Sequence, residues 1–110
     1  MSQMDITQHQ LLSTICQRLV AGFSPKKIIL FGSQARGTAD ERSDVDILVI
    51  CPINGNRRKL MVAMDKTLKG LGLARDIMVL SPEEYERDRM IPGTIARPAS
   101  LEGKVLYEEN

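Results

Sequence analysis

The sequence lacks the marks of a membrane-spanning or secreted protein. No apolar run approaches the roughly 18 residues that cross a bilayer, and the polar stretch from Met1 to Gln10 has no secretory signal pattern. Its two cysteines, Cys16 and Cys51, have neither metal-ligand spacing nor the pattern of a disulfide framework. We therefore expect a cytoplasmic protein in which both thiols belong to the core.

An excess of positive charge is also missing. The chain has 15 basic and 14 acidic side chains, a net charge of +1, so direct nucleic-acid binding is not expected. The charges are unevenly distributed, because bases dominate from Arg57 to Arg75 and acids dominate from Ser81 onward. These segments are either two solvated faces or a basic surface for a nucleoside triphosphate and an acidic surface for a partner.

The chain length and apolar content favour one globular unit. With 110 residues and 43% hydrophobic residues, the sequence is expected to form a single domain over residues 1–110 rather than a disordered segment. The single histidine, His9, lies near the start of a predicted helix and is expected to face solvent.

Hydrophobic periodicity predicts an α+β fold with a mixed sheet of three or four strands and helices packed on it. The expected helices cover Asp5 to Gly22, Ser33 to about Thr38, Arg57 to about Leu71, Ser81 to about Met90, and Gly93 to Leu101, the last interrupted by Pro98. The expected strands are Ile28 to Phe31, Val45 to Ile50 and Arg75 to Leu80, with Lys104 to Tyr107 as an edge strand or an extended tail.

A glycine–serine turn follows the first strand. Gly32 and Ser33 stand between a buried strand and a short helix, where backbone N–H groups remain unpaired and the helix dipole favours negative charge. Such a turn is suited to phosphate. Arg36, in the same short helix, either helps to hold phosphate or pairs with a carboxylate that braces the loop.

Acidic residues stand at the start of the second and third predicted strands. Asp44 and Asp46 are two residues apart, so both side chains leave the same face, and Asp76 has an equivalent place on the third strand. Carboxylates this close repel each other unless a cation lies between them. The pattern predicts a site for divalent cations, which can clamp a phosphoryl group during its transfer. Each motif alone could be a common turn or a pair of solvated loop carboxylates.

Taken together, Gly32-Ser33-Gln34-Ala35-Arg36-Gly37 and Ser43-Asp44-Val45-Asp46-Ile47-Leu48-Val49 resemble the signature of the DNA polymerase β-like nucleotidyltransferases. The short chain is most similar to their minimal branch, whose members often serve as antitoxins beside a HEPN-domain toxin. The resemblance implies that Asp44, Asp46 and Asp76 bind two Mg²⁺ ions and carry catalysis, and that Gly32, Ser33 and Arg36 bind the nucleotide.

The same resemblance implies the substrates. AMP from ATP would be moved to a tyrosine hydroxyl of the HEPN-domain toxin, with Asp76 lowering the pKa of that hydroxyl or receiving its proton. Two alternatives remain open from the residues. The chain could be a binding module that neutralises a toxin by covering it, or a subunit that modifies small molecules with help from a second domain.

Overall fold

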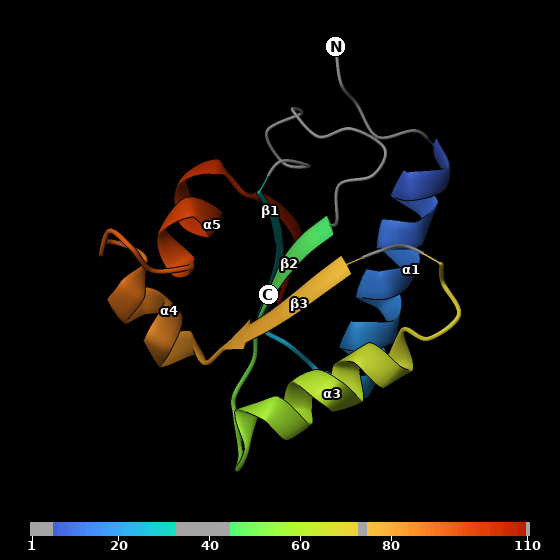
Figure 1. Cartoon of the computed structure of the whole chain (residues 1–110), viewed down its shortest axis with the longest axis horizontal. Helices are drawn as coiled ribbons and strands as arrows, with labels where there is room; N and C mark the ends of the chain where they lie inside the picture. The colour runs from blue at the N-terminus through green and yellow to red at the C-terminus, as the bar shows by residue number, and fades with distance from the viewer. Residues whose placement is uncertain (1–5, 33–44, 73–74, 110) are drawn as a thin grey trace.

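A mixed four-stranded sheet forms the centre of the protein (Figure 1). The computed structural model describes residues 6–32, 45–72 and 75–109. The strands are β1 (Lys27–Phe31), β2 (Val45–Ile50), β3 (Arg75–Leu80) and β4 (Lys104–Glu108), in the spatial order β3-β2-β1-β4. Strand β1 pairs antiparallel with β2 and β4, whereas β2 and β3 are parallel. The expected α+β class is confirmed, and the segment after Lys104 is an edge strand.

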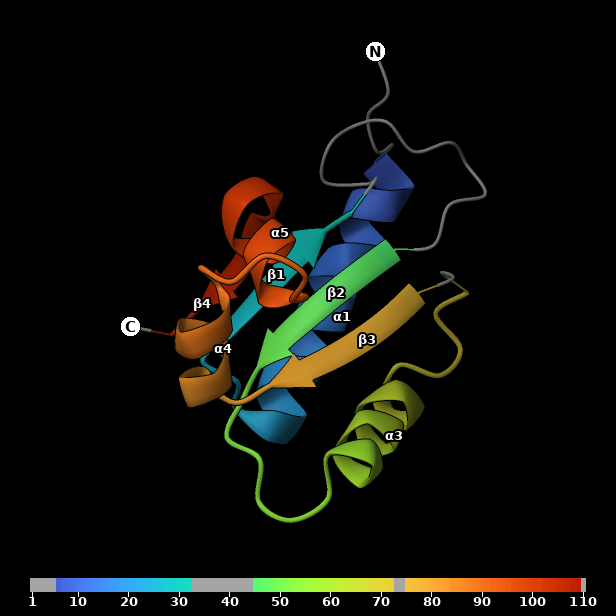
Figure 2. The ribbon, with the colours of Figure 1, turned by 60° about the vertical axis from the view of Figure 1, so that its left-hand side comes forward.

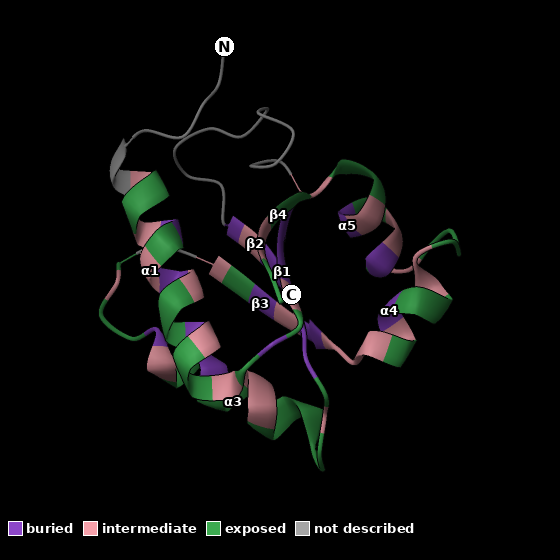
Figure 3. Ribbon diagram, turned by 180° about the vertical axis from the view of Figure 1, so that it is seen from behind, coloured by how far each residue is buried: buried purple, intermediate pink, exposed green. Residues whose placement is uncertain are grey.

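Helices cover both faces of this sheet (Figure 1). Helices α1 (Ile6–Phe23) and α3 (Arg57–Thr67) lie on one face, and α4 (Pro82–Asp88) and α5 (Ala96–Glu102) lie on the other. Because side chains alternate along a strand, each face of the sheet supplies its own apolar cluster. Figure 3 shows the buried residues concentrated in the strands and on the helix surfaces turned toward them.

The two apolar clusters determine which residues face which helices. The larger cluster joins α1 and α3 to Ile28 and Leu30 of β1. It also includes the odd-numbered apolar residues of the next two strands, Val45, Ile47 and Val49 of β2 and Ile77 and Val79 of β3. The smaller one joins α4 and α5 to Ile29 and Phe31 of β1. It also includes Leu48 and Ile50 of β2 and Met78 and Leu80 of β3. Even-numbered residues of β2 and β3 therefore face the layer formed by α4 and α5.

The long helices end close to their expected boundaries. Helix α1 continues through Gly22 to Phe23, and Ser24, with a φ of 49°, takes the left-handed conformation that ends it. In α3 the Asn56 side chain accepts a hydrogen bond from the Lys59 N–H at 3.1 Å and caps the first turn. Helix α3 ends at Thr67, four residues before the expected end, and turns continue to Gly70.

A capping box begins α4, as its sequence predicts. The Ser81 hydroxyl accepts from the Glu84 N–H at 3.1 Å, and the Glu84 carboxylate accepts from the Ser81 N–H at 2.9 Å. The same carboxylate forms an ion pair with Arg57 of α3, whose guanidinium also donates to the Val79 carbonyl. The hydrogen bond from Ser81 and the charge of Arg57 lower the pKa of Glu84. Glu84 thus links α4, α3 and the end of β3.

Glutamine in place of Glu84 can keep the capping-box hydrogen bond but loses the ion pair with Arg57. We therefore expect Glu84→Gln to lower the free energy of unfolding by about 0.5 kcal/mol, a usual value for a surface ion pair, or about 2 °C in Tm. The folded-state pKa of Glu84 lies below its unfolded value, so this contribution is complete above the unfolded pKa and is lost as the pH falls through the folded one. Thermal unfolding should therefore separate the two proteins at neutral pH, and their Tm values should converge as the pH falls through the folded-state pKa of Glu84. Glu83→Gln, at an exposed neighbour, is the control; equal Tm values for all three proteins at neutral pH would contradict the role of Glu84.

The expectation that Pro98 interrupts the last helix is wrong. Helix α5 runs without a break from Ala96 to Glu102, and Pro98 is its third residue. The first four N–H groups of a helix have no partner within the helix, so a proline there removes no hydrogen bond. The Thr94 hydroxyl accepts from the Arg97 N–H at 3.3 Å and satisfies a neighbouring donor.

Strand β4 pairs with β1 through a bulge. Ile28 pairs with Tyr107 and Ile29 with Val105, which leaves Leu106 as the extra residue. Leu106 and Tyr107, although consecutive, both pack against the cluster under α1. The bulge thus gives two apolar side chains to one face of the sheet.

Both cysteines are free thiols, as expected. Cys51 is buried and its thiol donates to the Phe23 carbonyl at 3.5 Å, whereas Cys16 is half-buried on α1. Burial raises the pKa of the Cys16 thiol to about 11, and it also raises the pKa of Cys51. Neither sulfur is therefore activated as a nucleophile near neutral pH. Among the helices that the structure describes, none has the length and apolar character needed to cross a membrane.

Candidate active site at the ends of β1, β2 and β3

The end of β1 and the beginnings of β2 and β3 lie at the same end of the sheet (Figure 2). Phe31, the last residue of β1, pairs with Asp46, and Asp46 pairs in turn with Asp76. Neighbouring strands lie about 4.8 Å apart, so the backbones of these three residues form one short row across the sheet. Gly32 directly follows that row. Three of the predicted site residues, Gly32, Asp46 and Asp76, are thereby brought together.

Asp46 and Asp76 also face the same side of the sheet. Asp46 is in phase with Leu48 of β2, and Asp76 is in phase with Met78 of β3. Leu48 and Met78 both pack with the cluster under α4 and α5, so the two carboxylates extend that face beyond its apolar part. Asp46 is half-buried and Asp76 is exposed. One carboxylate is therefore held against protein while the other is open to a substrate.

Gly32 lies directly against Asp46. The φ of Gly32 is 78°, a left-handed conformation that glycine adopts at little cost. A methyl group at residue 32 would lie 2.3 Å from Oδ2 of Asp46 and 3.2 Å from its carboxyl carbon. A methyl group at this position would therefore force the Asp46 carboxylate to move.

The other predicted site residues, Ser33, Arg36 and Asp44, lie outside the described residues, as does the expected short helix from Ser33 to about Thr38. Within the described ranges, no group of three His, Cys, Asp or Glu side chains is arranged to hold a metal ion. Asp46 and Asp76 nevertheless supply carboxylate oxygens, the donors that Mg²⁺ prefers. The donor chemistry of these two residues fits Mg²⁺, and Asp44 would complete the set.

Comparison with known proteins identifies the family of this chain. Residues 10–99 match the family described as nucleotidyltransferase domain, a span that includes Gly32, Asp46 and Asp76. The chain belongs to the nucleotidyltransferase domain family. A Methanocaldococcus jannaschii protein named "Putative protein adenylyltransferase MJ0604" is 37% identical over 82 residues, which are 74% of this chain and 78% of that protein.

Two solved structures share the fold of this nucleotidyltransferase. One is described as a putative nucleotidyltransferase from Sulfolobus solfataricus, with a TM-score of 0.67, 19% identity, and coverage of 99% of this chain and 93% of the other. The second is described as a toxin-antitoxin with AMP-PNP, with a TM-score of 0.54, 21% identity, and coverage of 89% of this chain and 74% of the other. At these identities the likeness concerns the fold.

A hollow beside Asp76 was not predicted from the sequence of this nucleotidyltransferase. It has a volume of about 440 Å³ and lies between α3 and the edge of β3. Arg58, Lys66, Arg75 and Asp76 are among its lining residues, with Val62 and Ile77 as apolar lining. The signal that could have revealed it is the four-residue spacing of Arg58, Val62 and Lys66, which places them along one side of α3.

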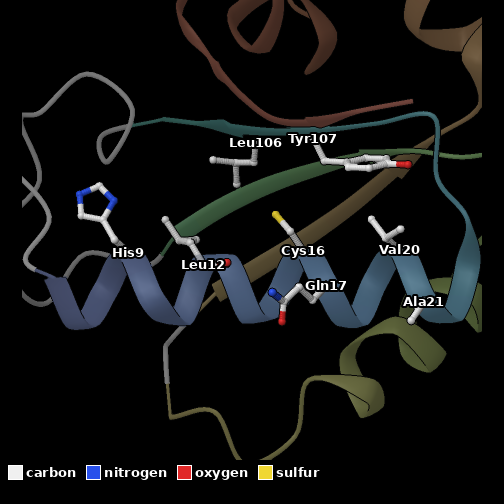
Figure 4. A pocket seen from close by; sticks show the side chains of 9 residues that line it. His9, Leu12, Cys16, Gln17, Val20, Ala21, Leu106 and Tyr107 are labelled. Carbon is white, nitrogen blue, oxygen red and sulfur yellow. The ribbon is translucent and has the colours of Figure 1, made fainter. Parts of the chain in front are cut away.

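A second hollow, of about 560 Å³, lies between α1 and β4, on the face of the sheet opposite the Asp46 and Asp76 side chains (Figure 4). Leu106 and Tyr107 of β4 stand over the α1 residues Leu12, Cys16 and Val20 there. His9 at its rim is exposed to solvent, as expected. The hollow is mostly apolar and Asp46 and Asp76 face away from it, so it plays no part in the proposed chemistry.

Proposed function

We propose that this nucleotidyltransferase moves AMP from ATP to a hydroxyl group of a partner protein and thereby acts as an antitoxin. The acceptor that we favour is a tyrosine of a HEPN-domain toxin. The observation that carries the proposal is the pairing of Asp46 with Asp76 beside Gly32, in a chain 37% identical to a protein named as an adenylyltransferase. The similarity in fold to a toxin-antitoxin structure with AMP-PNP also supports the proposal.

The reaction needs positioning and charge neutralisation more than covalent help from the protein. The acceptor oxygen forms a bond to the α-phosphorus of ATP, the bond to pyrophosphate breaks, and the hydroxyl proton leaves. We assign Asp44, Asp46 and Asp76 as ligands of two Mg²⁺ ions, which when bound would neutralise the attacking and leaving oxygens. Asp76 is exposed at the sheet edge, where it can take the proton of an incoming hydroxyl.

We assign the nucleotide to the side of Asp46 that faces β1, away from Asp76. Gly32 ends β1 next to Asp46, and we propose that the backbone N–H groups of Gly32 and Ser33 and the Ser33 hydroxyl hold the β and γ phosphates. Arg36 either adds a charge to this phosphate site or braces its loop. The acceptor then reaches the α-phosphorus from the side of Asp76, as in-line displacement requires.

Labelling with radioactive ATP tests this proposal directly. The full chain is incubated with Mg²⁺, the protein encoded by the neighbouring gene, and ATP labelled at either the α or the γ phosphate. AMP transfer to a tyrosine puts α-label, and no γ-label, on the partner, and peptide mass spectrometry locates the AMP. A tight complex without label would overturn the enzymatic proposal and favour a binding module. Label on an added small molecule instead would exclude the protein acceptor.

A further inference from the structure

The outer side of α3 combines cations with an exposed apolar residue. Arg58, Val62 and Lys66 follow one another at four-residue spacing, so they lie in line along the helix. All three are exposed, and Val62 has 46% of its surface open to solvent. Met64 of the same helix is buried and lies on the side that faces the core. Helix α3 therefore presents a second surface, which faces away from the core.

Two hollows lie along this line of residues. One is the hollow of about 440 Å³ that ends at Asp76, and the other, of about 490 Å³, is bordered by Lys59. Arg58, Val62 and Lys66 line both hollows and form the ridge between them. We call this ridge together with its two flanking hollows the α3 groove. Because the groove has apolar as well as cationic lining residues, it can contact apolar side chains and acidic side chains of a bound molecule.

The α3 groove carries an excess of positive charge. Its acidic residues are Asp65 and Asp76, and Asp65 already faces Arg75 at 3.1 Å. Arg58, Lys59 and Lys66 form no ion pair with any acidic side chain in the described part of the chain. These cations are thus available to a negatively charged molecule.

The α3 groove reaches the site around the edge of β3. Helix α3 packs on the face of the sheet opposite the Asp46 and Asp76 side chains, but Asp76, on the edge strand, is among the residues that line the groove. Going across the sheet, Gly32 follows β1, Asp46 is on β2, and Asp76 is on the edge strand β3. Helix α3 lies beside β3, on the side away from β1 (Figure 2). Because attacking and leaving groups are in line on opposite sides of the phosphorus, phosphates held near Gly32 leave the groove to the acceptor.

We propose that the α3 groove binds an acidic segment of the partner protein that carries the acceptor hydroxyl. This proposal rests on the proposed function and deepens it by naming the chemistry of the acceptor. Acidic side chains of the segment pair with Arg58 and Lys66, and an apolar side chain covers Val62. No aromatic side chain lines either hollow in the part of the chain that the structure describes, and single-stranded nucleic acid usually binds through stacking on aromatic side chains.

Charge reversal of the groove tests this inference. We expect R58E/K66E to raise the KM for the partner about tenfold or more with little change in kcat or in the KM for ATP, because the lost attraction acts on docking alone. The wild-type KM should also rise with salt, and that dependence should weaken in the variant. The double variant K69E/K104E changes the net charge equally at exposed lysines outside both hollows, and it should behave as wild type.

A random copolymer of glutamate and tyrosine separates this inference from the proposed function. Its binding is measured without ATP, by titration into wild type, R58E/K66E and K69E/K104E, with a lysine–tyrosine copolymer as the probe of opposite charge. Selective binding of the acidic copolymer, lost only in R58E/K66E, supports the groove even if no nucleotide is transferred. Equal binding of the acidic copolymer by all three proteins would overturn the inference. A raised KM for ATP in R58E/K66E would overturn it as well.

Discussion

Asp46→Asn should abolish Mg²⁺-dependent nucleotide transfer while the protein remains folded. Asparagine keeps the shape of the side chain that lies against Gly32 but removes the charge that would hold the cation. Metal ions contribute several kcal/mol to the stabilisation of phosphoryl-transfer transition states, and each 1.36 kcal/mol is tenfold in rate. We therefore expect a loss of at least about 1,000-fold in the labelling of the partner.

The control for this experiment is Glu86→Gln, which removes a carboxylate from the exposed surface of α4 and should leave transfer unchanged. Calorimetric titration with Mg²⁺ and ATP adds a second readout, because Asp46→Asn should weaken metal binding even without a partner. Thermal unfolding should show a Tm at or near that of wild type. If Asp46→Asn labels the partner at the wild-type rate, Asp46 is not a metal ligand and the site is misassigned.

The predictable part of the fold is the part controlled by periodicity. Strands β2 and β3 occur exactly over the expected residues because each is a short apolar run bounded by turn or polar residues. The i, i+4, i+8, i+11 spacing of Leu60, Met64, Leu68 and Leu71 predicts one apolar stripe, which begins in α3 and continues past its end. Met64 and Leu68 are in the core, and the two end members are half-buried. The capping box of Ser81 and Glu84 is confirmed, because its chemistry is local to four residues.

The less predictable part depends on position within an element and on contacts between elements. Pro98 was expected to interrupt α5, yet it lies in the first turn, where its missing N–H has no consequence. A shift of two or three residues in the helix start decides this question, and sequence patterns do not fix helix starts that closely. Similarly, the bulge that turns Leu106 and Tyr107 to one face depends on pairing with β1 and has no local signature.

The candidate site could be predicted as a set of residues but not as a geometry. The order of the glycine–serine turn and the acidic residues indicated a shared site, and the pairing of Asp46 with Asp76 places two of its members side by side. The roles of all the predicted site residues, Gly32, Ser33, Arg36, Asp44, Asp46 and Asp76, stay predictions. What sequence could not give is the α3 groove beside Asp76, because it arises from the packing of α3 against the edge of β3.

The packing of α3 against β3 separates the basic residues between Arg57 and Arg75 into two groups. The basic segment from Arg57 to Arg75 is not used uniformly. Arg57 pairs with Glu84 and Arg75 pairs with Asp65, so both connect elements of the fold. Arg58 and Lys66 instead face the groove. In the proposed docking, Arg58 and Lys66 belong to a binding surface, whereas Arg57 and Arg75 of the same segment connect elements of the fold.

Gly32→Ala should damage both stability and transfer, and the reason is the contact with Asp46. Alanine at a φ of 78° costs about 1–2 kcal/mol of backbone strain, and its methyl group would lie 2.3 Å from Oδ2 of Asp46. The carboxylate must therefore move, and a displacement of about 1 Å at a catalytic group can cost about 100-fold in rate. We expect about that loss in the labelling assay, together with a lower Tm. Gly55→Ala is the control for strain alone, because Gly55 has a φ of 94° and an added methyl group there would meet no described residue other than its chain neighbours within 4 Å.

A double-mutant cycle separates the contact from the strain. In an Asp46→Ala background the atoms that collide with the new methyl group are gone, so Gly32→Ala should then cost only about as much stability as Gly55→Ala does in wild type. The coupling between positions 32 and 46, measured by chemical denaturation, should therefore be at least about 1 kcal/mol. A coupling near zero would mean that the glycine is required only for its backbone conformation. The close packing of turn and carboxylate would then have no part in placing Asp46 for nucleotide transfer.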